Sequence, residues 1–84
     1  MNSNKQNLIN KIKYRSQYRG TKEMELFINK FVNSIIQELD LNQLLELNNL
    51  VNFDDEKIIK ISNDKISESD NKVIFLLKEF KKKY

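Results

Sequence analysis

The sequence lacks cysteine, histidine, proline and tryptophan, and it has a single glycine among its 84 residues. Without thiols or imidazoles the chain has no disulfide, no nucleophilic cysteine, no histidine base and no Cys/His set for zinc. No hydrophobic run approaches the roughly 18 residues that cross a bilayer, and no hydrophobic signal core follows Met1. We therefore expect no membrane insertion, no metal site and no catalysis that depends on these side chains.

Residues that break helices are rare, and the composition is 39% hydrophobic and 32% charged. These properties favour helices over strands. A chain of this length buries only about 60–65% of its unfolded surface, so we expect no deep, enclosed active site. We predict one all-α domain over residues 1–84, a small bundle of about five helices.

Hydrophobic residues recur at helical spacing along most of the chain. The spacing predicts helices over about residues 4–17, 21–39 and 41–50, a short helix that carries residues 58–61, and a last helix with a basic tail within about 68–84. The second helix has the longest apolar stripe. We expect its side chains to form the centre of the core, above all Phe27, Ile28, Phe31 and Ile35. Core packing explains the two phenylalanines better than a cofactor-binding role does.

Several polar residues have the spacing of helix caps. Asp40 with Gln43 has the form of a capping box before the third helix, and either aspartate of the pair 54–55 can cap the short fourth helix. Ser67 and Asp70 have a similar arrangement before the last helix. These caps place the predicted helix starts.

The only glycine, Gly20, lies between basic residues that precede it and acidic residues that follow it, in the segment of residues 14–25, YRSQYRGTKEME. A glycine that follows a cation-rich helix end typically adopts a positive φ and terminates the helix. We predict this conformation for Gly20. Thr21 can then cap the next helix, and Glu23 and Glu25 lie in its first turn, where negative charge is favoured. The segment is predicted to be a corner between two helices.

This corner has two interpretations. In the first, its residues only cap and connect the two helices. Thr21 and one acidic residue would satisfy that role, however, and the segment gathers further arginine and tyrosine residues, which are typical of protein interfaces. In the second interpretation, the corner is a binding surface for a partner protein, formed by Tyr14, Arg15, Arg19, Gly20, Lys22, Glu23 and Glu25.

The same corner resembles the signature of the SdhE family, small factors that promote covalent attachment of FAD to the flavoprotein subunit of succinate dehydrogenase. The core of that signature is R-G-x-x-E-x-D/E, which Arg19, Gly20, Glu23 and Glu25 match. The wider run extends from Arg15 through Leu26 to Phe31.

A second block of the chain, residues 55–61, is similar to the acidic turn D-P-D-L-x-x-W of that family. Asp55 and Ile58 fit the pattern, whereas Glu56 stands at the position of the proline and Ile61 at that of the tryptophan. Together the two blocks extend the resemblance over about residues 11–62.

The resemblance implies a binding protein and not an enzyme. SdhE-type factors are small helical bundles that bind the flavoprotein subunit, whose own histidine forms the bond to the 8α-methyl carbon of the flavin. FAD would then be attached to the partner and not stably bound by this chain. Arg19, Gly20, Glu23 and Glu25 would contact the partner, with Tyr14, Arg15 and Lys22 as supporting contacts. We expect a monomer in the bacterial cytoplasm, and whether fumarate reductase is a second partner is left open.

The sequence fits two other classes of function less well. An enzyme would need general acids or bases drawn from carboxylates that already have capping explanations. Nucleic-acid binding is the stronger alternative, because the isoelectric point is about 9.2 and no acid precedes Glu23. Against it, the net charge is only +3 and 12 acidic residues follow. We therefore expect no nucleic-acid partner.

Overall fold

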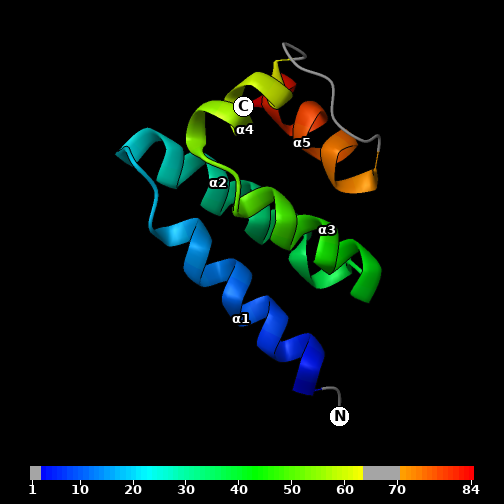
Figure 1. Ribbon diagram of the computed structural model, residues 1–84. Helices are drawn as coiled ribbons and strands as arrows, with labels where there is room; N and C mark the ends of the chain where they lie inside the picture. The colour runs from blue at the N-terminus through cyan, green and yellow to red at the C-terminus, as the bar shows by residue number, and fades with distance from the viewer. Residues whose placement is uncertain (1–2, 64–70) are drawn as a thin grey trace.

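The computed structural model describes residues 3–63 and 71–84 and has five α-helices and one short 3₁₀ helix within them (Figure 1). The elements are α1 (Ser3–Gln17), α2 (Lys22–Ile35), the 3₁₀ helix η1 (Ile36–Glu38), α3 (Leu41–Val51), α4 (Asp55–Ser62) and α5 (Lys72–Lys83). The prediction of an all-α bundle of about five helices is confirmed. No helix in this part of the chain is long and apolar enough to cross a membrane.

The caps explain where most helices begin. Asp40 and Gln43 form the predicted capping box, with the Gln43 N–H donating to Asp40 Oδ1 at 2.8 Å and the Asp40 N–H donating to Gln43 Oε1 at 3.1 Å. Asn71 caps α5 by accepting the Ile74 N–H at 2.8 Å. The cap predicted from Ser67 and Asp70 lies outside the described residues.

The second helix is shorter than predicted. The spacing predicts a helix over residues 21–39, but α2 ends at Ile35 and the chain continues as η1 before Leu39 becomes extended. A 3₁₀ turn is a common way to tighten the end of a helix. Asp40 has to be extended to cap α3, so the helical path must end before it.

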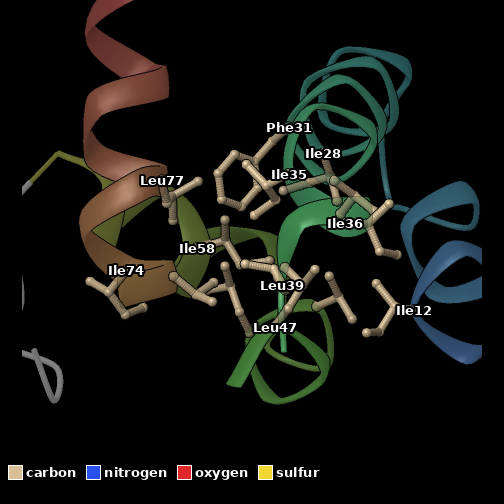
Figure 2. Packing of buried hydrophobic residues seen from close by; sticks show 14 of the residues in the cluster. Ile12, Ile28, Phe31, Ile35, Ile36, Leu39, Leu47, Ile58, Ile74 and Leu77 are labelled. Atoms are coloured by element: carbon tan, nitrogen blue, oxygen red, sulfur yellow. The ribbon is translucent and has the colours of Figure 1, made fainter. Parts of the chain in front are cut away.

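The core is built on α2, as its apolar stripe predicts. Phe31 and Ile28 are fully buried, and the side chains of Phe27 and Ile35 are less than 10% exposed. Figure 2 shows Ile12 of α1, Leu47 of α3, Ile58 of α4, and Ile74 and Leu77 of α5 packed around the α2 residues Ile28, Phe31 and Ile35. Every α-helix therefore contributes to one hydrophobic core.

The helix order brings two connections together. α1 packs against α2 and α3, while α5 packs against α3 and α4. Figure 1 shows α1 on one side of the pair α2 and α3, with α5 on the other. The corner between α1 and α2 consequently meets the turn between α3 and α4, although the two segments are more than 30 residues apart.

Candidate partner-binding corner

Arg19 joins the two connections through its guanidinium group. Nε donates to Asp55 Oδ1 at 2.8 Å, and Nη2 lies 2.8 Å from the same oxygen. Nη1 donates to the Val51 carbonyl at 2.6 Å, and Nη2 donates to the Phe53 carbonyl at 2.8 Å. The side chain is only 4% exposed. Its donors are thus directed into this chain and not toward solvent.

The Arg19 contacts have a clear physical cause. Val51 is the last residue of α3, so its carbonyl has no partner inside that helix, and a cation suits the negative end of the helix dipole. Asp55 is the first residue of α4, where a carboxylate suits the positive end of the dipole. Arg19 therefore bridges the end of one helix and the start of the next. We call the contacts of Arg19 and Gly20 with Val51, Phe53 and Asp55 the latch.

Gly20 completes the latch through its backbone. Its N–H donates to Asp55 Oδ2 at 2.8 Å. The predicted positive φ is wrong, because the φ of Gly20 lies outside the left-handed region. A Cβ at this position would instead lie 2.9 Å from Asp55 Oδ2, closer than side chains tolerate. Glycine is needed here so that the carboxylate can approach the backbone.

The two aspartates at the start of α4 have different roles. Asp54 caps the helix by accepting the Lys57 N–H at 2.8 Å. The Asp55 carboxylate is therefore available to accept hydrogen bonds from Arg19 and Gly20. The sequence indicates that one of the two caps the helix but does not indicate that the other binds Arg19. A helix needs only one N-cap residue, so the second aspartate at the start of α4 is the only local signal of this second role.

Thr21 caps α2, as predicted. Its backbone is extended, with φ −135° and ψ 160°, and Oγ1 accepts the Met24 N–H at 3.2 Å. Glu23 and Glu25 lie in the first turn. Lys22 Nζ is 3.9 Å from Glu25 Oε1, a long and largely exposed pair of small energetic weight.

The exposed side of the corner carries two tyrosines and the charged side chains of Arg15 and Glu23. The rings of Tyr14 and Tyr18 lie 4.7 Å apart and are 61% and 67% exposed. Arg15 and Glu23 are exposed, and neither side chain has a bonding partner among residues 3–63 and 71–84. These groups can bind another molecule without breaking a contact in this chain.

A hollow of about 290 Å³ lies beside the latch, and we call it the polar hollow. It is lined by Arg15, Tyr18, Arg19, Gly20, Asn52, Phe53, Asp54 and Asp55. Lys57 Nζ lies 3.9 Å from the centre of the Phe53 ring, a cation–π contact at its edge. The surface near the glycine is therefore concave and polar.

All seven residues of the sequence-based surface lie around this corner. Tyr14 and Arg15 belong to the end of α1, Arg19 and Gly20 to the connection, and Lys22, Glu23 and Glu25 to the start of α2. The structure divides them into those that hold the corner and those that face outward. Ile61, at the tryptophan position of the acidic turn, is fully buried and faces the core.

Fold and site together define a small helical bundle with a charged, self-supported corner suited to contact with another protein. Among the described residues there is no group of three or more His, Cys, Asp or Glu that could hold a metal ion. Residues 10–81 match the family model Sdh5, described as the flavinator of succinate dehydrogenase. The chain belongs to this family, and the SdhE resemblance is confirmed.

The family match establishes the role of the chain as a flavinylation factor for succinate dehydrogenase, and no finding favours nucleic-acid binding. Comparison with curated proteins and with solved structures gives no significant match.

Proposed function

We propose that this chain binds the flavoprotein subunit of succinate dehydrogenase through the outward-facing residues of the corner and thereby promotes covalent attachment of FAD to that subunit. The observation that carries the proposal is the division of the corner. Arg19 is fully engaged in the latch, whereas Arg15 and Glu23 are exposed without partners in the described part of the chain. A cation and an anion at one corner can pair with opposite charges on a partner.

In this proposal Arg19 and Gly20 act by holding the contact surface in place. A surface fixed before binding loses less conformational freedom on association, so more of the contact energy appears as affinity. The latch fixes the connection between α1 and α2 with bonds to Val51, Phe53 and Asp55. Tyr14, Lys22 and Glu25 surround the contact as supporting residues.

The chain promotes the reaction without supplying its reacting groups. Its contribution is a preference for the conformation of the flavoprotein in which the partner's own residues react with the flavin. A factor shifts such an equilibrium only by its difference in affinity for the two conformations, and a tenfold shift corresponds to about 1.4 kcal/mol. A few charge-assisted contacts are enough to provide that difference.

The test is flavinylation of the isolated flavoprotein subunit, with FAD and a dicarboxylate, in the presence and absence of this chain. Covalent flavin is read from fluorescence on a denaturing gel. We expect the chain to raise the rate or yield and to remain unlabelled itself. Glu23→Ala should reduce the effect, whereas Glu38→Ala, an exposed carboxylate in η1 at the other end of α2, should not. Equal flavinylation with and without the chain would contradict the proposal.

Three further parts of the proposal need their own measurements. We expect the free chain to be a monomer by sedimentation, to hold no FAD after gel filtration, and to be found in the bacterial cytoplasm on fractionation. The same flavinylation assay with the fumarate reductase flavoprotein decides whether that subunit is a second partner.

A further inference from the structure

A second hollow is formed in part by the first turn of α2, and we call it the apolar groove. It has a volume of about 280 Å³ and is lined by Thr21, Glu23, Met24, Phe27, Ile59, Ser62, Lys81 and Tyr84. These residues come from the start of α2, from α4 and from the end of α5. Figure 1 shows the C-terminus beside α4.

The apolar groove has an apolar floor and one aromatic wall. Met24 and Phe27 are nearly buried, while Ile59 is 40% exposed and Tyr84 is 58% exposed. The Tyr84 ring meets Phe27 edge-on at 5.0 Å and lies 5.7 Å from Phe80. These ring contacts hold Tyr84 in position, so the apolar groove is formed before any partner arrives.

The rim of the groove carries one charge of each sign. The exposed Glu23 carboxylate is the same group that lacks a partner among the described residues. Lys81 also lines the groove, with Nζ 5.6 Å from the centre of the Phe27 ring. Because the Glu23 carboxylate is negatively charged, a cation of the partner is favoured next to it.

We propose that the apolar groove receives an apolar side chain of the flavoprotein subunit, with a basic residue of the same subunit next to it facing Glu23. This inference rests on the proposed function. Its main support is continuity, because Thr21 and Glu23 line the apolar groove and belong to the same corner as Arg15, Arg19 and Gly20, which line the polar hollow. A partner that covers Glu23 must also cover the mouth of the groove.

The size of the groove agrees with this occupant. Small-molecule sites usually have volumes of about 300–1,000 Å³, so a hollow of about 280 Å³ is small even for a modest ligand. It is suited to one inserted side chain, which is how hydrophobic anchors fill pockets at protein interfaces. Tyr84 and Ile59 thereby become contact residues outside the corner motif.

The test measures the affinity of the flavoprotein subunit for three variants by calorimetry or surface plasmon resonance. Ile59→Asp places a charge at the mouth of the groove and should weaken binding at least tenfold. Ile59→Leu keeps the apolar surface and should bind within about twofold of wild type. Leu45→Asp is the matched control, because Leu45 is 49% exposed on α3 and lines neither hollow. It should leave the affinity unchanged.

The Tyr84→Ala variant gives a second, independent measurement. Removing the aromatic wall should weaken binding several-fold, and circular dichroism at the assay temperature confirms that each variant is folded. If wild type binds but Ile59→Asp and Tyr84→Ala bind as tightly, the groove inference is overturned and the proposed function stands. If wild type itself does not bind the flavoprotein subunit, the proposed function fails, and the groove inference fails with it.

Discussion

Replacing Arg19 with alanine tests whether this residue holds the corner. Among residues 3–63 and 71–84, the change leaves the Asp55 carboxylate with only the Gly20 N–H as a donor. It also removes the Arg19 donors of the Val51 and Phe53 carbonyls. Breaking a buried ion pair by removing one partner typically costs about 3–5 kcal/mol. Asp55 is 23% exposed, so water can partly replace the lost contact. We therefore expect a loss of about 2–4 kcal/mol.

That loss is a large share of the stability of so small a domain, which is about 4–12 kcal/mol by the usual value per residue. In a domain of this size, 1 kcal/mol corresponds to about 4–8 °C in Tm, so Arg19→Ala should lower Tm by roughly 8–32 °C. The assay is thermal and urea unfolding followed by circular dichroism at 222 nm.

Arg15→Ala is the matched control for this measurement. Arg15 is the same residue type, lines the same hollow and lies one helical turn away, but its side chain is exposed and has no partner in the described part of the chain. Its replacement should change stability by less than about 0.5 kcal/mol and should instead weaken binding to the flavoprotein subunit. If the two variants unfold at the same temperature, the latch does not stabilise the fold and the reasoning is refuted.

Two further changes test the rest of the corner. Gly20→Val should destabilise the fold by about 1–3 kcal/mol, because its Cβ must displace the Asp55 carboxylate and break the charge-assisted hydrogen bond from the Gly20 N–H. If this variant is as stable as wild type in urea, the close approach of the Asp55 carboxylate to Gly20 does not constrain this position. Thr21→Ala should cost about 1 kcal/mol as a lost helix cap, with little effect on flavoprotein affinity once the protein is folded. A large loss of affinity in folded Thr21→Ala would instead make Thr21 a contact residue.

The helices were predictable because their signals are local. The apolar stripe of α2, the capping box at Asp40 and the charged start of α4 each lie within a few residues, and each corresponds to the structure. The end of α2 was predicted too late, since the stripe continues through Leu39 while the chain has already become 3₁₀ at Ile36. A periodic pattern records which residues are buried, and buried residues can also lie in a turn.

The latch could not be predicted in the same way, because it joins residues 36 positions apart. The sequence places Arg19 and Gly20 at a corner, but which carboxylate meets them depends on how α3 packs against α1. The same limitation explains the error at Gly20. A glycine that follows a helix usually indicates positive φ, and only the position of Asp55 reveals a steric reason instead.

The division of the corner changes how variants of the motif should be interpreted. A residue that holds the fold lowers apparent affinity by reducing the folded fraction, whereas a residue that contacts the partner lowers the affinity of the folded molecule itself. Arg19 and Gly20 belong to the first kind by their bonds to Asp55, and Arg15 and Glu23 belong to the second by their exposure. Cooling the flavinylation assay from near Tm restores the folded fraction and should therefore recover the part of the first kind of loss that comes from unfolding. The smaller part that comes from a less fixed contact surface should remain. Cooling should leave variants of Arg15 and Glu23 impaired, because these variants are already fully folded at the higher temperature. Temperature thus separates two causes that one assay at one temperature would report as the same loss of function.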